Sequence, residues 1–338
     1  MTTYKGINGF AVQSVASDPS PLDEGQVWYN NATYAFKLAA ATTVGTFASG
    51  GALNTARMYG NNGGAGTQTA ALSFGGAPSA PAAPQLTTSE SYNGTSWTAT
   101  PSLNTGRSLA AGCGATNTAA LCIAGANPST NDGVLTESWN GTSWSPVNSL
   151  NTGRYGLAGV GVQTAALAFG GENAGGGGAG GTAASESWNG TSWTTTPSLN
   201  TLRRSIGGLG LNTAAVAFGG VGPGSPVTNT ELWNGSSWTN NPTGLNTARR
   251  GARGGGTSTA GIGVGGSSPA TGATELWNGS TWTSSPTGLT TARDEGSFAG
   301  TQTLGVYAGG NPGPGTGVTT TEEWTGPGVA TTQTITTS

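Results

Sequence analysis

The amino-acid sequence predicts an all-β fold made of six repeated units, and three recurring strings support this prediction. The first string, Leu-Asn/Thr-Thr-x-Arg, occurs six times, with its arginines 50, 47, 49, 46 and 44 residues apart. The second string ends in a glycine pair, as in TAALSFGG, and the third places Asn-Gly between aromatic residues, as in ESWNGTSW. A period of this length is typical of one four-stranded blade of a β-propeller. We therefore predict a six-bladed β-propeller, with seven blades as the alternative.

Each period predicts four strands in a fixed order. Strand a follows the arginine, strand b ends at the glycine pair, strand c ends before Asn-Gly, and strand d begins at the next Trp. Small and β-branched residues alternate in these segments without a helical period, which favours strands. Asn-Gly predicts a two-residue hairpin turn, because both turn positions need a positive φ. The glycine pair permits a tight turn and close approach of the neighbouring blade.

The two ends of the repeat region predict how the ring closes. The sixth period ends near Trp324 and lacks a fourth strand. Phe47 lies six residues before the first repeat leucine, the spacing at which a Trp precedes the next three repeat leucines. We therefore expect residues 43–49 to supply the missing strand. Joining both ends in one blade removes exposed sheet edges.

These strings, taken in order, resemble the pattern of the kelch family of β-propellers. An arginine after a Thr-rich stretch, a hydrophobic strand ending in Gly-Gly, and spaced aromatic residues occur across about residues 43–325. The chain departs from the family pattern in having Trp-Asn-Gly or Tyr-Asn-Gly instead of Tyr-Asp, and one Ala-Gly for Gly-Gly. Some kelch proteins are copper oxidases or actin binders, but the oxidases' metal-binding histidines have no counterpart here. The expected domains are an arm over 1–42, the propeller over 43–326 and a Thr-rich tail over 327–338.

The composition argues against several classes of function. The 338 residues include 62 Gly, two Cys and no His, and only 7% are charged, with a net charge of −3. Zinc-finger and haem sites and His-dependent nucleophiles therefore lack their residues. There is no basic footprint for nucleic acid and no apolar run that approaches a membrane span. The start, MTTYKGINGF, lacks the apolar centre of a secretory signal, so we expect synthesis in a cytoplasm. We predict a protein that is not an enzyme, with no cofactor, no metal and no membrane insertion.

Most charges of the repeat region occupy two repeated positions, which predicts six Arg–Glu pairs. A structural ion pair between strands is the favoured interpretation, and a ring of anion-binding arginines in the channel is the alternative. If the pairs are buried, loss of one partner costs about 3–5 kcal/mol. The residues are Arg57, Arg107, Arg154, Arg203, Arg249 and Arg293, with Glu90, Glu137, Glu186, Glu231, Glu275 and Glu322.

Other conspicuous residues have mainly structural interpretations. The repeated Trp pairs favour blade packing over sugar stacking, and Asn-Gly-Ser/Thr favours hairpin turns over glycosylation. Cys113 and Cys122 fall on neighbouring strands, where two buried thiols are favoured over a disulfide. Asp294 and Glu295 are adjacent, so in a strand they would point to opposite faces and would not form an acid/base pair.

The connections between strands b and c vary in length and predict the binding face. They span 77–88, 126–135, 172–184, 221–229, 267–273 and 311–320. Loops of one kind gather on one face of a propeller, and loops on a rigid scaffold are natural binding elements. They contain no aromatic residue, so they make a poor sugar platform or enzyme cleft. The candidate binding residues are Asn127, Asn131, Asp132, Glu172, Asn173, Asn229 and Asn311.

The N-terminal segment lies outside the repeat. GQVWYNNATYAFKL, residues 25–38, alternates around Asn-Asn and predicts a β-hairpin. With the preceding INGFAVQSVASDPSP it resembles the N-terminal segments of tail-fibre and other structural proteins of tailed bacteriophages, especially marine ones. In those proteins such a segment anchors a variable distal domain to the particle. The Thr-rich tail would be a spare strand or an attachment peptide.

The phage resemblance implies a virion structural and adhesion protein. Its partners would be other virion proteins, bound through residues 1–42, and a glycan or protein of the host surface. The first alternative is an intracellular module that docks a protein partner through its loops. The second is a lectin-like carbohydrate binder or carbohydrate-active enzyme. That alternative requires clustered acids or exposed Trp on the disc face, and the sequence indicates neither.

Overall fold

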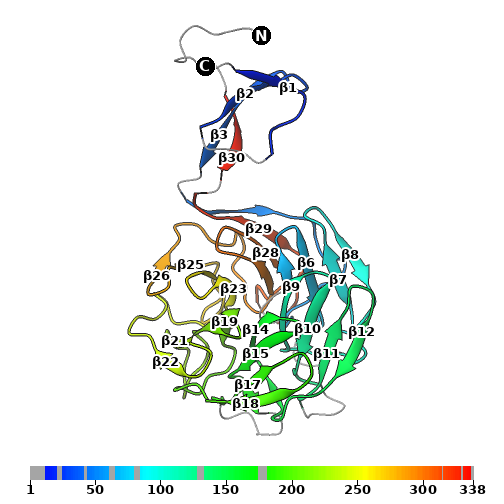
Figure 1. Ribbon diagram of the computed structural model, residues 1–338, viewed down its shortest axis with the longest axis vertical. Helices are drawn as coiled ribbons and strands as arrows, with labels where there is room; N and C mark the ends of the chain where they lie inside the picture. The colour runs from blue at the N-terminus through cyan, green and yellow to red at the C-terminus, as the bar shows by residue number, and fades with distance from the viewer. Residues whose placement is uncertain are drawn as a thin grey trace. The chain divides into compact units, whose positions relative to one another are not determined.

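The regular structure of the protein consists of β-strands (Figure 1). The computed structural model describes residues 12–20, 25–41, 44–60, 65–79, 84–127, 133–173, 181–313, 315–328 and 330–335. The chain divides into two compact units, Phe47–Trp324 and a smaller unit of Met1–Thr46 with Thr325–Ser338. Within the described ranges, no helix is long and apolar enough to cross a bilayer.

The described part of the larger unit contains a two-stranded sheet of β13 (Arg154–Tyr155) and β16 (Glu172–Asn173) and six four-stranded antiparallel sheets. The first three contain β5 (Ala65–Thr67), β6 (Ala70–Phe74), β7 (Ser89–Tyr92) and β8 (Trp97–Thr100); β9 (Ala111–Thr116), β10 (Ala119–Ile123), β11 (Thr136–Trp139) and β12 (Trp144–Val147); and β14 (Ala158–Val162), β15 (Ala165–Phe169), β17 (Ser185–Trp188) and β18 (Trp193–Thr196). The next two contain β19 (Gly207–Leu211), β20 (Ala214–Phe218), β21 (Thr230–Trp233) and β22 (Trp238–Asn240); and β23 (Arg253–Thr257), β24 (Ala260–Val264), β25 (Thr274–Trp277) and β26 (Trp282–Ser284). The last contains β27 (Ser297–Gly300), β28 (Leu304–Ala308), β29 (Thr321–Thr325) and β4 (Thr46–Ser49).

The inner strands form a closed cycle, as in a β-propeller. β5, β9, β14, β19, β23 and β27 each contact the next, and β27 contacts β5 again. These strands are rich in glycine because they converge on the centre. A Cβ added to Gly208 would lie 2.9 Å from the Cβ of Ala158 and 2.8 Å from the ring of Phe169. Residues of strand a must therefore be small where neighbouring inner strands pack closely.

The sixth sheet confirms the predicted closure. β4 is its outermost strand, beside β29, so segments from opposite ends of the repeat region share one sheet. Phe47 stacks on Trp324 with ring centroids 4.9 Å apart, much as Trp144 stacks on Trp139 at 5.4 Å. Gly310 N–H donates to the Arg57 carbonyl at 2.8 Å, repeating the bond from Gly76 to Arg107 between the first two sheets.

The Asn-Gly turns differ from the two-residue turns that we predicted. Tyr92 pairs with Trp97, so four residues lie between β7 and β8. The Asn93 side-chain oxygen accepts the backbone N–H groups of Thr95 and Ser96, at 2.9 and 2.8 Å. Only Gly94 in this loop has a positive φ, of 89°. The Asn side chain therefore stabilises a longer loop, because it replaces the backbone partner that a tight turn would supply.

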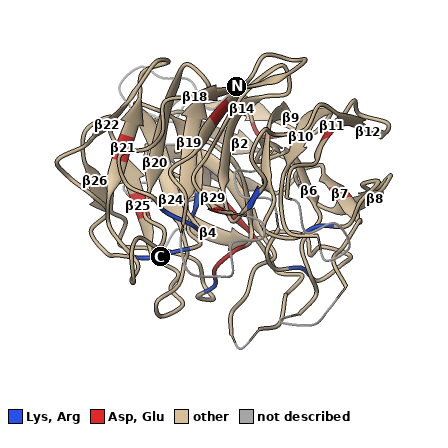
Figure 2. Ribbon diagram, turned by 90° about the horizontal axis from the view of Figure 1, so that it is seen from below, with Lys and Arg blue, Asp and Glu red and all other residues tan. Residues whose placement is uncertain are grey.

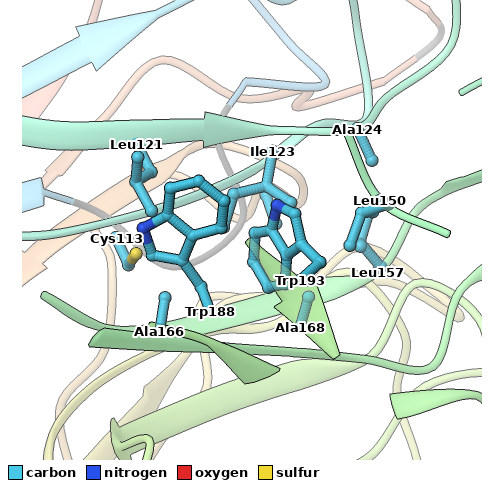
Figure 3. Close-up of a cluster of buried hydrophobic side chains, with 11 residues drawn as sticks. Cys113, Leu121, Ile123, Ala124, Leu150, Leu157, Ala166, Ala168, Trp188 and Trp193 are labelled. Carbon is cyan, nitrogen blue, oxygen red and sulfur yellow. The ribbon is translucent and has the colours of Figure 1, made fainter. Parts of the chain in front are cut away.

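The hydrophobic core lies between adjacent sheets (Figure 3). Trp188 and Trp193 pack there against Leu121 and Ile123 of the neighbouring sheet. All eleven Trp side chains are at most 6% exposed, which confirms the packing interpretation. Cys113 belongs to this cluster.

Cys122 belongs to the cluster on the other face of the same sheet. Both cysteines are free, as the favoured interpretation expected. Burial raises the pKa of each thiol to about 12.

The smaller unit contains a sheet made from both ends of the chain. Its order is β1 (Gln13–Val15), β2 (Val27–Asn30), β3 (Ala35–Ala41) and β30 (Ala330–Thr334). β2 and β3 form the expected hairpin, and β30 adds antiparallel to β3. The predicted Thr-rich tail therefore contributes a strand to the arm. Trp28 is buried, and its indole N–H donates to Asp18 at 2.9 Å.

Candidate functional site

The six predicted Arg–Glu pairs are all present and buried. Each arginine precedes strand a, and its glutamate lies on strand c of the same sheet. In one of them, Arg203 Nη2 lies 2.8 Å from Glu231 Oε1, and both side chains are fully buried. The pairs are Arg57–Glu90, Arg107–Glu137, Arg154–Glu186, Arg203–Glu231, Arg249–Glu275 and Arg293–Glu322.

The Leu-Asn-Thr string supplies hydrogen-bond donors to the repeat carboxylates, as at Glu90. Glu90 accepts the backbone N–H of Asn54 at 2.7 Å, its side-chain amide at 2.9 Å, and the N–H of Thr55 at 3.1 Å. Burial acts to raise the pKa of Glu90, but the bonds from Asn54 and the charge of Arg57 hold that pKa below its usual value. Arg57 also donates to the Gly75 carbonyl at 2.8 Å. All six repeat arginines are at most 1% exposed and paired with a glutamate of their own sheet, so the alternative of an anion-binding ring is wrong.

A ring of unusual backbone conformations follows the repeat arginines. The residue two positions after each arginine has a positive φ between 46° and 65°. Backbone hydrogen bonds link these residues around the centre, including Leu109 N–H to Tyr59 O and Gly251 N–H to Ser205 O, at 2.8 and 2.9 Å. Non-glycine residues in this conformation are strained, and such strain is common at functional sites. The six residues are Tyr59, Leu109, Gly156, Ser205, Gly251 and Glu295.

A polar cavity of about 160 Å³ lies at this ring, and the segments that precede strand a of all six sheets contribute to its lining. We call it the channel mouth. It is lined by Tyr59, Leu109, Tyr155, Gly156, Glu172, Arg204, Ser205, Arg250, Asp294, Glu295 and Asn311.

Most of the charged residues of the larger unit that do not belong to the repeat pairs line the channel mouth. Figure 2 shows how little of the ribbon carries any charge. Within 47–324, the charged residues outside the six pairs are Arg204, Arg250, Arg253, Asp132, Glu172, Asp294, Glu295 and Glu323. Five of these eight line the cavity. A sixth, Arg253, acts on one of them, because its charge lowers the pKa of Glu295.

The charged groups of the mouth are only partly paired. Arg204 Nη1 lies 3.2 Å from Glu172 Oε2, and the Arg204 side chain is 35% exposed. Arg250 is exposed, and its Nε donates to Ser267 Oγ at 3.3 Å. Ser267 Oγ in turn donates to Asp294 Oδ2. Ser267 therefore connects a guanidinium to a carboxylate at the rim.

Asp294 and Glu295 differ from the repeat acids in having no ion pair with an arginine among the described residues. Both are at least 95% buried, yet Asp294 Oδ1 and Glu295 Oε2 have no hydrogen-bond partner among the described residues. Burial and the charge of Asp294 raise the pKa of Glu295 to about 7, against the opposing effect of Arg253 and Arg250.

The predicted separation of these two acids is wrong. Asp294 forms an isolated bridge with Asn311, and Glu295 has a φ of 55°, so strand alternation does not apply to them. Both therefore line one cavity. A signal for the site was present in the sequence. The two residues after each repeat arginine vary strongly, as in Arg-Met-Tyr and Arg-Asp-Glu, while the surrounding string is nearly constant.

Two of the predicted loop residues line the mouth. One is Glu172, paired with Arg204. The other is Asn311, whose side-chain oxygen also accepts the N–H groups of Gly313 and Gly315 at 2.9 and 3.2 Å.

The other predicted loop residues do not line this cavity. Asn127 is buried and donates to the Gly106 carbonyl at 3.1 Å. Asn173 is exposed and pairs through its backbone with Arg154, and the carbonyl of exposed Asn229 accepts Arg203 Nη1 at 2.8 Å. The remaining two lie outside the described residues; they are Asn131 and Asp132.

A wider groove of about 410 Å³ adjoins the mouth. Arg204 and Arg250 line both hollows, and the loops 221–226 and 267–270 supply the rest of the groove. The two guanidinium groups therefore lie where the cavity and the groove meet.

Comparison with known proteins supports the fold. No protein-family model and no curated protein matches the chain. A solved structure titled "Structure of YjhT", a β-propeller, is similar with a TM-score of 0.65 and 14% sequence identity. The similarity covers 84% of this chain and 99% of that one. At this identity the likeness shows the β-propeller fold alone.

Proposed function

We propose that the chain is a non-enzymatic attachment protein of a phage particle. In this proposal the propeller contacts its binding partner, a component of the host surface, through the channel mouth. The arm joins the propeller to other virion proteins. The observation that supports the proposal most directly is the gathering of five non-repeat charges at one cavity in a chain that is 7% charged.

The division of charge supports a binding role for the mouth. The repeat pairs use their charges internally, inside each sheet. The charges at the mouth differ from sheet to sheet, and Arg250 is exposed to a ligand. A β-propeller commonly serves as a rigid scaffold for such a surface, with its loops supplying specificity.

The smaller unit supports the attachment role. It is a separate compact unit, and its sheet contains strands from both ends of the chain. A sheet of this kind presents edge strands that can pair with another protein. Its β2–β3 hairpin falls in the segment that resembles phage structural proteins.

Mass spectrometry of density-purified particles tests this function. We would compare the full chain with a variant that lacks both 1–42 and 327–338, since β30 loses its partner strand if only 1–42 is removed. The full chain should be present in stoichiometric amount, and the truncated chain should be absent although circular dichroism shows it folded. Absence of the full chain from particles would overturn the virion proposal and favour an intracellular interaction module.

A carbohydrate binder is the second candidate function, because the structure supplies a feature that this alternative requires. Glu172, Asp294 and Glu295 cluster on one cavity together with Tyr59 and Tyr155. The sequence had indicated no such cluster. A glycan array probed with the full chain and with Glu295→Gln tests this candidate. Binding to a defined glycan that the substitution abolishes would support it.

A further inference from the structure

Two buried carboxylate oxygens at the channel mouth lack a donor. Asp294 is 4% exposed and Glu295 is 5% exposed, and one oxygen of each has no hydrogen-bond partner among the described residues. A buried carboxylate oxygen without a donor is costly. Both residues line the cavity, so a bound molecule can supply the missing donors.

The backbone leaves room for these acids at one position. A Cβ added to Gly251 would lie 2.8 Å from Glu295 Cγ and 3.4 Å from Asp294 Cβ. The absence of a side chain at Gly251 therefore allows both carboxyl groups to lie at the cavity. Its volume of about 160 Å³ corresponds to roughly five waters at ~30 Å³ each, which is enough for a small organic molecule.

Positive charge lies directly beside the two acids. Ser267 is bonded to both Arg250 and Asp294, so the guanidinium and the carboxylate are held on either side of one hydroxyl. Arg204 and Arg250 also line the adjoining groove. A ligand that reaches from the acids toward the groove meets a negative site first and a positive site next.

We propose that the channel mouth binds a small zwitterion, whose protonated primary amine donates to Asp294 and Glu295 and whose anionic group lies between Arg204 and Arg250. An ammonium group supplies three donors, which matches two carboxylates with unpartnered oxygens. The proposal rests on the proposed function in taking the mouth as the contact surface, and it adds the chemistry recognised there. It concerns an organic cation, since no metal-binding cluster of His, Cys, Asp or Glu is found in the described ranges.

The surroundings of Glu295 predict how binding depends on pH. Asp294 precedes it, while Arg253 of β23, Arg250 and Tyr59 face it from other sheets. Because its pKa is about 7, ionised Glu295 is the minor form at pH 6 and the major form at pH 8. An amine resembling Lys stays protonated over this range. Affinity for the zwitterion should therefore rise about tenfold from pH 6 to pH 8, in proportion to the ionised fraction.

Titration calorimetry on the full chain tests the proposal with three probes: 4-aminobutyrate, n-propylammonium and propionate. We expect 4-aminobutyrate to bind most tightly, n-propylammonium more weakly, and propionate most weakly. Glu295→Gln should weaken 4-aminobutyrate binding about tenfold at pH 8 and remove the pH dependence. Glu323→Gln is the matched control, because Glu323 accepts the Tyr92 hydroxyl away from the cavity, and it should leave binding unchanged.

A second variant distinguishes the contribution of the ligand's anionic group from that of its ammonium group. Arg250→Gln changes an exposed side chain, so the fold should persist. It should weaken 4-aminobutyrate binding relative to n-propylammonium binding, because only 4-aminobutyrate carries the anionic group that the guanidinium would contact. No binding of 4-aminobutyrate at millimolar concentration, or equal binding by Glu295→Gln, would overturn the proposal. Particle association is measured separately, so a chain present on particles that fails to bind the zwitterion refutes this inference alone.

Discussion

The repeat pairs and the channel mouth both bury glutamate side chains, but the two regions give these carboxylates different partners. Glu231 accepts the Asn200 and Thr201 N–H groups at 2.6 and 3.3 Å and pairs with Arg203. Glu295 is as inaccessible, yet one of its oxygens has no donor in the described structure. Burial alone therefore does not distinguish a structural acid from a functional one. The paired arginine does, because every repeat acid has one and no ion pair of Glu295 is found among the described residues.

The largest expected effect comes from breaking a repeat pair. Glu231→Ala leaves Arg203 buried without its carboxylate, so the free energy of unfolding should fall by about 3–5 kcal/mol. Urea unfolding measures the loss. Glu172→Ala is the control, because its partner Arg204 is 35% exposed and the expected loss is below about 1 kcal/mol. Equal losses of unfolding free energy in the two variants would show that the repeat pair is no more stabilising than the pair at the mouth.

Ionisation of Glu295 at the channel mouth should destabilise the folded protein, whereas the ionised repeat glutamates stabilise it. The folded pKa of Glu295 is about 7 against roughly 4.3 in an unfolded chain, so the folded state keeps a proton in this interval. The free energy of unfolding should therefore fall as the pH rises from about 4 to 7, by about 3 kcal/mol from this residue, and change little above it.

Unfolding curves at pH 5, 7 and 8 check this dependence. Glu295→Gln should flatten the pH profile and be more stable than the natural chain at pH 8. Glu323→Gln should keep the natural profile. A Glu295→Gln profile that falls as steeply as the natural one would show that another group titrates.

A smaller effect tests the donors of the repeat acids. Asn200→Ala removes an amide that donates to Glu231 at 3.0 Å and to the Trp238 carbonyl at 3.1 Å, and it should cost about 2 kcal/mol. Asn200→Thr should cost less, because Thr290 holds the equivalent position in the sixth sheet and donates its hydroxyl to Glu322 at 2.8 Å. Thermal unfolding ranks the two variants, and an equal loss would contradict the role of the side-chain donor.

The smallest expected change in stability is at the floor of the mouth. Gly251→Ala should cost about 1 kcal/mol, the usual cost of a left-handed conformation for an L-residue. Tyr59 and Leu109 already adopt this conformation in the same ring, both with a φ of 54°. The added methyl displaces Glu295, so 4-aminobutyrate binding should be lost although the fold remains. Unchanged binding would show that the acids do not hold the amine.

The regular features of the protein could be predicted because each is repeated. Six copies of one string identified the Arg–Glu pairs, and the position of Phe47 identified the closing strand. The turn after Tyr92 was predicted too short, since the Asn93 side chain accepts two N–H groups and stabilises a longer loop. The hairpin of the arm was also predictable, but the pairing of β3 with β30 joins residues almost 300 positions apart.

The sequence by itself determined the strands, the pairs and the closed ring, because local patterns repeated at one period specify the same sheet each time. The tertiary structure decided the site. Asp294 and Glu295 occur once, in an irregular segment, and no periodicity indicates where their side chains point. Only the meeting of six sheets at the centre brings them together with Arg250 and Arg204, since residues that differ between sheets converge where the ring narrows.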